Sequence, residues 1–114
     1  MEANLKTEDK EQNSEFDSNS QKVSEHELLD SIKPLLEREA RDRINVLLTL
    51  YYMARDPSKN SIAIDLDVSP STVGRYCTII EHELRISDVR KFAIEQGLDR
   101  YKLDEFKQIV GIEN

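Results

Sequence analysis

From residue 24 onward, apolar residues recur every three or four positions, which is the spacing of helices that bury one face. Alternation of β-branched and polar residues, which is typical of paired strands, forms no convincing pair of segments. The pattern therefore predicts an all-α fold: a small helical bundle that contains a helix-turn-helix and has no convincing wing, that is, no β-hairpin beside it.

The first helix is predicted to begin at Ser24. Ser24 and Glu27 have the spacing of a capping box, and Val23 and Leu28 can add a hydrophobic staple. Pro34 either kinks this helix or opens a second one. The apolar positions of this segment are Leu28, Leu29, Ile32, Leu35 and Leu36.

A longer helix is expected from Leu35 to about Arg55, and Asp56-Pro57-Ser58 is expected to end it. A basic cluster begins this helix, but each arginine has an acidic residue four positions away, so intrahelical pairing is the preferred interpretation. The pairs are Glu37 with Arg41, Glu39 with Arg43, and Arg38 with Asp42. Tyr51 and Tyr52 are expected in the core and at its rim.

The middle of the chain predicts two helices joined by a tight turn. A short helix runs from Ser58 or Ser61 to Leu66, and Asp67 suits the left-handed backbone of the turn. Ser69 caps the next helix, with Pro70 at its first position, and this helix runs to about Leu84. Its inward stripe is Val73, Tyr76, Ile80 and Leu84, whereas its outward positions are Ser71, Gly74, Arg75, Thr78 and His82.

Two further helices are expected at the C-terminal end. Ser87 is expected to cap the first and Gly97 to close it. The last is expected to begin at Asp99 or Arg100. The inward positions of the two helices are Val89, Phe92 and Ala93, then Leu103, Phe106, Ile109 and Val110.

The segment from Ile62 to Val73 has the residue types that a helix-turn-helix needs. Ala63 is small enough for two helices to cross closely, and Val68 can fill the turn. Leu66 and Val73 can hold the crossing. This order of small, large, turn and capping residues predicts a helix-turn-helix at about 58–84.

At these residues the chain resembles the LuxR-type (GerE-type) helix-turn-helix family. The match runs from Ala54 through Ser69-Pro70-Ser71-Thr72-Val73 to Leu84 and, after a shortening of about three residues, continues over Phe92–Leu98. The resemblance implies a four-helix DNA-binding module whose Ser69–Leu84 helix enters the major groove. The chain has Gly74 where the family usually has a basic residue, and Asp67 where it usually has glycine.

Eight residues are candidates for DNA contact. Arg75 is placed to bond a guanine edge, the alternative being a solvated arginine paired with Glu81 or Asp65. Hydroxyl groups at the start of the same helix can bond phosphates or serve only as caps. The full set is Lys59, Asn60, Ser69, Ser71, Thr72, Gly74, Arg75 and Thr78.

The charge balance restricts where DNA can bind. The 114 residues carry a formal net charge of −7, whereas a basic surface is the usual signature of nucleic-acid binding. Residues 1–23 hold six acidic and three lysine residues and few apolar ones, which predicts a disordered acidic tail. Residues 24–114 form the expected helical domain and remain mildly acidic, so a DNA-binding face has to be local.

The remaining inventory argues against catalysis and cofactors. Cys77 is the only cysteine and is expected to be a buried small hydrophobe, and His26 and His82 have no flanking ligands for a metal site. No set of residues resembles an enzyme active site, so neither an enzyme nor a cofactor is expected. No apolar run is long enough to cross a membrane, and the polar N-terminal segment does not resemble a secretory signal, so we expect a cytoplasmic protein.

Together these observations predict a sequence-specific regulator of transcription that binds double-stranded DNA, with a homodimer expected because pairing doubles the base contacts. Its interface is sought in the Leu28–Leu36 stripe or in the Leu103, Phe106 and Val110 stripe. The alternative is a protein-interaction module of the same fold that docks on the transcription machinery or on another regulator.

Overall fold

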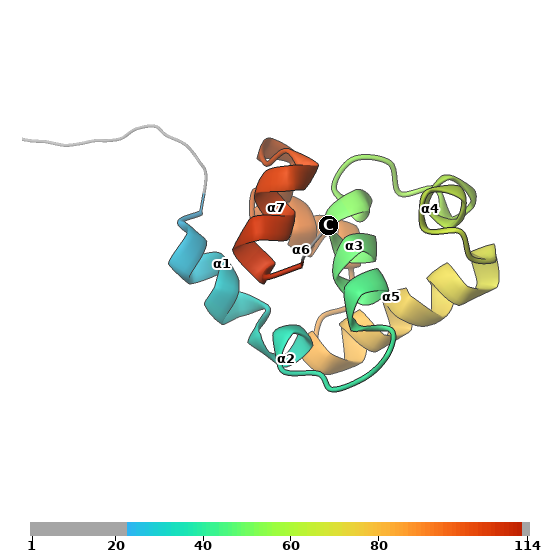
Figure 1. Cartoon of the computed structure of the whole chain (residues 1–114), viewed down its shortest axis with the longest axis horizontal. Coiled ribbons are helices and arrows are strands. Elements are labelled where there is room, and N and C mark those ends of the chain that lie inside the picture. The colour runs from blue at the N-terminus through green and yellow to red at the C-terminus, as the bar shows by residue number, and fades with distance from the viewer. Residues whose placement is uncertain (1–22, 113–114) are drawn as a thin grey trace, which may run out of the picture.

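Residues 23–112 are described by the structure, a computed structural model, and they form seven α-helices, one short 3-10 helix and no strand (Figure 1). This confirms the predicted all-α bundle. The elements are α1 (Glu25–Ser31), α2 (Lys33–Leu36), α3 (Arg43–Met53), α4 (Lys59–Leu66), α5 (Pro70–Leu84), α6 (Val89–Glu95), η1 (Leu98–Arg100) and α7 (Leu103–Val110).

The start of α1 agrees with the prediction. The Glu27 backbone N–H donates to the Ser24 hydroxyl, and the Ser24 backbone N–H donates to the Glu27 carboxylate, at 3.2 Å each. Val23, which was expected to belong to the tail, packs against the core, and its carbonyl accepts a hydrogen bond from the Tyr101 hydroxyl. The rest of the predicted tail lies outside the described residues. Pro34 stands in the first turn of a second helix, α2.

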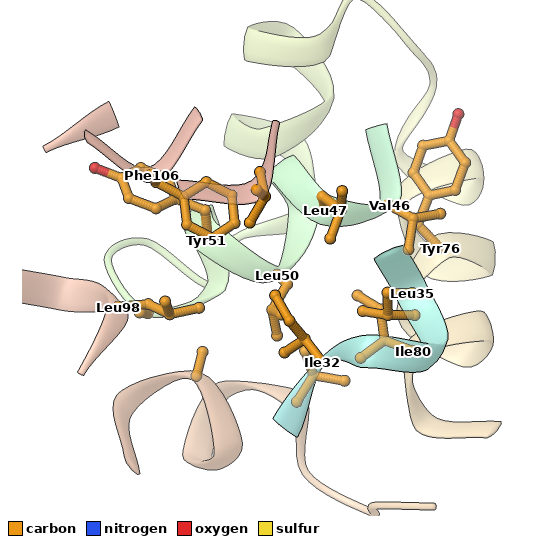
Figure 2. Packing of buried hydrophobic residues seen from close by; sticks show 14 of the residues in the cluster. Ile32, Leu35, Val46, Leu47, Leu50, Tyr51, Tyr76, Ile80, Leu98 and Phe106 are labelled. Carbon is orange, nitrogen blue, oxygen red and sulfur yellow. The ribbon is translucent and has the colours of Figure 1, made fainter. Parts of the chain in front are cut away.

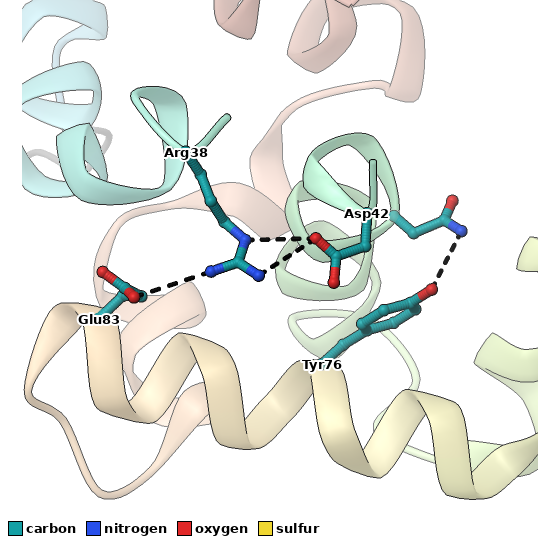
Figure 3. Close-up of polar contacts among 5 residues, drawn as sticks. Arg38, Asp42, Tyr76 and Glu83 are labelled. Carbon is teal, nitrogen blue, oxygen red and sulfur yellow. Dashed lines mark hydrogen bonds and ion pairs between the residues drawn. The ribbon is translucent and has the colours of Figure 1, made fainter. Parts of the chain in front are cut away.

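The predicted helix from Leu35 to Arg55 is wrong in its first third. The chain leaves helical structure after Leu36 and re-enters it at Arg43, although glutamate, alanine and arginine in between all favour helix. The Arg38 guanidinium donates to Asp42 at 3.2 Å and forms an ion pair with Glu83 of α5 at 3.7 Å (Figure 3). The 37–42 segment is therefore held as a turn that ties α2 and α3 to α5.

Because this segment is not helical, two of the three predicted intrahelical pairs do not form. Glu37 pairs with Lys33 at 3.8 Å instead of with Arg41, and Glu39 forms no ion pair within the described part of the chain. The pairing of Arg38 with Asp42 is confirmed, but it bridges a turn rather than a helix.

The core is built around α3, which contacts α2, α4, α5 and α6. Its buried side chains meet those of the surrounding helices in one continuous cluster (Figure 2). Tyr51 is buried and Tyr52 is partly exposed, as predicted. The fully buried large residues include Leu28, Ile32, Leu35, Leu47, Leu50, Ile62, Ile80, Leu98 and Phe106.

Burial in this cluster takes up most of the two stripes that the sequence offered for a dimer interface. Leu28, Ile32, Leu35 and Phe106 are 0% exposed within a single chain, and Val110 is 6% exposed. These side chains hold α1, α2 and α7 on the core of their own chain. Leu29, Leu36 and Leu103 of these stripes remain partly exposed, and the dimer stays a prediction.

Two expected boundaries near the C-terminus are corrected. Asp88, not Ser87, caps α6, because its carboxylate accepts the Lys91 backbone N–H at 2.9 Å. The last helix begins at Leu103, because Leu98–Arg100 forms a separate 3-10 turn.

That 3-10 turn is held to α3 by hydrogen bonds to backbone carbonyls. The Tyr51 hydroxyl donates to the Tyr101 carbonyl at 2.7 Å. The Arg55 guanidinium donates to the same carbonyl and to the Leu98 carbonyl, and it lies 4.3 Å from the centroid of the Tyr51 ring.

Within residues 23–112, no helix is long and apolar enough to span a membrane.

Candidate nucleic-acid interface

The helix-turn-helix of α4 and α5 forms as the sequence predicts. The Ser58 hydroxyl caps α4, and Asp67 ends it in the left-handed conformation, with φ 59° and ψ 48°. The Val68 backbone N–H then returns to the Ala63 carbonyl at 3.0 Å. Ala63 and Val73 are buried where the two helices pack on each other, so the turn and the crossing fix the direction of α5.

The start of α5 carries a cluster of three hydroxyl groups. The Thr72 backbone N–H donates to the Ser69 hydroxyl at 3.2 Å, which confirms Ser69 as the cap. The same Ser69 oxygen lies 3.0 Å from the Ser71 hydroxyl and 2.8 Å from the Thr72 hydroxyl. The three hydroxyl groups thus form hydrogen bonds with one another. Ser69 and Ser71 are still exposed at the N-terminus of α5, and the N-terminus of a helix favours anions.

Lys59, the first residue of α4, reaches across to α5. A methyl group built on Gly74 would lie 3.6 Å from the Lys59 ammonium nitrogen and 3.9 Å from its Cε. The family that the chain resembles usually has a basic residue at this position of α5. Here the ammonium group of Lys59 stands over the glycine instead.

Arg75 and Thr78 lie on the exposed side of α5, as predicted. Arg75 forms no ion pair within residues 23–112, so the expected alternative of pairing with Glu81 or Asp65 does not occur there. Its guanidinium lies 5.6 Å from the centroid of the Tyr76 ring. The Thr78 hydroxyl donates to the Gly74 carbonyl at 3.1 Å, which leaves the lone pairs of its oxygen free to accept.

Tyr76 helps to hold the orientation of α5. Its ring is 4% exposed, and its hydroxyl accepts a hydrogen bond from the Asn45 side-chain amide of α3 at 3.3 Å (Figure 3). Arg75, next to it on the exposed side, therefore extends from a helix whose buried face is fixed against α3.

The candidate residues form two groups. Lys59, Gly74, Arg75 and Thr78 lie at the start of α4 and along the first half of α5, close to the hydroxyl cluster. Asn60 instead lines an open groove of about 490 Å³ beside the turn, together with Ala63, Ile64, Asp67, Val68 and Pro70.

Sequence reasoning missed this groove and the 80% exposure of Ile64. A signal was present in the spacing, because Ile62, Ala63 and Leu66 already define the inner face of the short helix and leave Ile64 outside it.

Cys77 is buried, as predicted, at 8% exposure. Burial raises the pKa of the thiol, and the nearby charge of Lys59 opposes this only in part. The thiol is therefore a poor nucleophile at neutral pH. The part of the chain that the structure describes contains no group of three or more histidine, cysteine or acidic residues that could hold a metal ion.

The charges of the helix-turn-helix are unevenly distributed. Between residues 58 and 84 its bases are Lys59 and Arg75, which lie at the start of α4 and in the first half of α5. Its acidic residues lie at the ends of the two helices: Asp65 and Asp67, then Glu81 and Glu83.

Comparison of the chain with protein-family models, with curated proteins and with solved structures gives no match. The resemblance to the LuxR-type family stays a prediction.

Proposed function

We propose that the chain is a sequence-specific DNA-binding protein, with a role in transcription regulation, which reads the major groove with α5. The observation that carries the proposal is the position of Lys59 over Gly74, beside Arg75, which forms no ion pair within residues 23–112. Together they give the exposed first half of α5 two cations and no acidic side chain, in a chain that is acidic overall.

The chemistry of this face supports a division of roles. The Ser69 and Ser71 hydroxyls and the start of α5 suit a phosphate, as does the ammonium group of Lys59. Arg75 has the planar donor pair that a guanine edge accepts, and Gly74 next to it adds no side chain that would keep the helix out of the groove. With few cations, the face should bind DNA with a shallow dependence on salt.

The test begins by selecting bound sequences from a random pool of double-stranded DNA. Gel-shift titrations at several salt concentrations then compare variants on the selected site. Arg75→Ala should cost about 1–3 kcal/mol and relax preference at one base position. Lys59→Ala should weaken all sequences nearly equally and reduce the slope of log affinity against log salt by about one unit.

Matched controls remove the same charges elsewhere. Arg100→Ala and Lys102→Ala change exposed cations near α7 and should leave base preference unchanged. Arg75→Ala with unaltered affinity and unaltered base preference would show that α5 does not read DNA.

A second candidate function is a protein-interaction module of the same fold, and the net charge of −7 favours it. In that case the face formed by Ser71, Gly74, Arg75 and Thr78 would dock on an acidic protein surface. The random-pool selection separates the two candidates, because a protein-docking module should enrich no DNA sequence. A homodimer on DNA also remains part of the proposal.

A further inference from the structure

Among residues 23–112, the large apolar side chains that are strongly exposed are Ile44, Ile64 and Ile94, at 43%, 80% and 42%. Single exposed apolar residues are ordinary on protein surfaces. Ile64 and Ile94 differ from that background because their charged neighbours have opposite signs.

Ile64 lies in an acidic setting. It lines the open groove beside the turn between α4 and α5, whose walls include Ala63, Val68 and Pro70. Asp67 lines the same groove, and Asp65 follows Ile64 along α4. Both carboxylates belong to exposed residues and form no ion pair within the described part of the chain.

Ile94 lies in a basic setting. Arg90 and Lys91 precede it by four and three positions on α6, which places the three side chains on one side of the helix. All three residues are exposed, and neither cation forms an ion pair within residues 23–112. Glu95 is the acidic residue within this helix and the exposed Asp88 caps its start, so the two cations are the charges that share the Ile94 side of the helix.

We propose that a second copy of this chain docks head to tail, with Ile94 of one copy in the groove beside Ile64 of the other. Arg90 and Lys91 then face Asp67, which lines the groove, so that apolar contact and opposite charge act at the same place.

The two surfaces lie on different helices: Figure 1 shows α4 at one end of the bundle, whereas α6 lies behind α7, on the other side of α3. Each pair of bound copies therefore still presents one free groove and one free Ile94 surface, and the assembly extends into a row or closes into a ring rather than stopping at a symmetric pair. Lys59 and Arg75 take no part in the contact, so it does not depend on the proposed DNA contact.

The test is analytical ultracentrifugation without DNA, at low salt and over a wide range of protein concentration. The weight-average mass of the wild type should rise above the 13.2 kDa of one chain and fall back when salt is added. Ile64→Asn and Ile94→Asn change exposed positions and keep every charge, and each variant alone should stay monomeric. Ile44→Asn is the matched control and should associate like the wild type.

An equimolar mixture of Ile64→Asn and Ile94→Asn gives the decisive result. One variant keeps its Ile94 surface and the other keeps its groove, so the mixture should form pairs that stop at two chains. A mixture that stays monomeric while the wild type associates would overturn the proposal, as would a wild type that is monomeric at every concentration. Circular dichroism of each variant checks that α-helical content is unchanged.

Discussion

Replacing Gly74 with alanine should stabilise the fold and weaken DNA binding. Gly74 lies inside α5 and is not one of the glycines with positive φ, so its backbone suits any residue. The added methyl group would meet the end of the flexible Lys59 side chain at 3.6 Å, which is ordinary contact. A glycine inside a helix costs about 0.8–1.0 kcal/mol relative to alanine, so we expect a gain of about 1 kcal/mol.

For a domain of this size, that gain corresponds to a rise in Tm of roughly 4–8 °C. The fold thus carries a glycine that its own packing does not require. Close approach of α5 to DNA would explain this glycine. If so, Gly74→Ala should also lower DNA affinity by a factor of up to about ten, or about 1.4 kcal/mol, because the methyl group holds the helix off the groove.

Urea unfolding followed by far-UV circular dichroism measures the stability change as a shift in midpoint at constant m value. Gly111→Ala is the matched control, because Gly111 has φ 81° and its added methyl group would meet nothing within 4 Å. The same chemical change should there cost about 1 kcal/mol through backbone strain alone. A lower midpoint for Gly74→Ala would refute the packing argument, and a higher midpoint with unchanged DNA affinity would refute the close-approach argument.

Three other predictions concern the buried tyrosines and the N-terminal segment. Tyr51→Phe should cost about 1 kcal/mol in urea unfolding, because it leaves the buried Tyr101 carbonyl with one donor fewer. Burial raises the pKa of Tyr51, Tyr52 and Tyr101 above 10, so the unfolded state ionises first. The stability that these three tyrosines contribute should therefore be fully present below pH 10 and be lost as the pH rises further, and Tyr51→Phe should make this loss less steep. Deleting residues 1–22 takes the net charge from −7 to −4 and keeps the Ser24 cap, so differential scanning calorimetry should give an unchanged Tm.

Local rules predicted most of the helices because each has its own start or stop signal. Ser24, Ser58 and Ser69 all accept a backbone N–H at the helix start, and Asp67 takes the left-handed conformation that ends α4. These signals act within four residues, so they can be recognised in the sequence alone. The helix-turn-helix was predicted for the same reason.

Where tertiary contacts override local preference, the prediction failed. The 37–42 segment consists largely of good helix formers, yet it turns because Arg38 connects it to Asp42 and to Glu83, the latter 45 positions along the chain. Similarly, Leu98–Arg100 leaves the expected last helix because Tyr51 and Arg55 of the α3 region bind the carbonyls around it. No spacing within either segment reports such partners.

The candidate site was predictable residue by residue but not as a surface. Its members were recognised from the exposed side of α5, yet the sequence could not indicate that Lys59 reaches Gly74, fifteen positions later. That contact needs α4 and α5 to pack closely, which Ala63 permits at 3% exposure. The face at Gly74 on α5 therefore carries the charge of a side chain from α4, which the order of residues along the chain does not show. Charge acts at a place in space rather than at a place in the sequence, and with Lys59 and Arg75 the first half of α5 is a basic face on an acidic protein, the face that the proposed function brings to DNA.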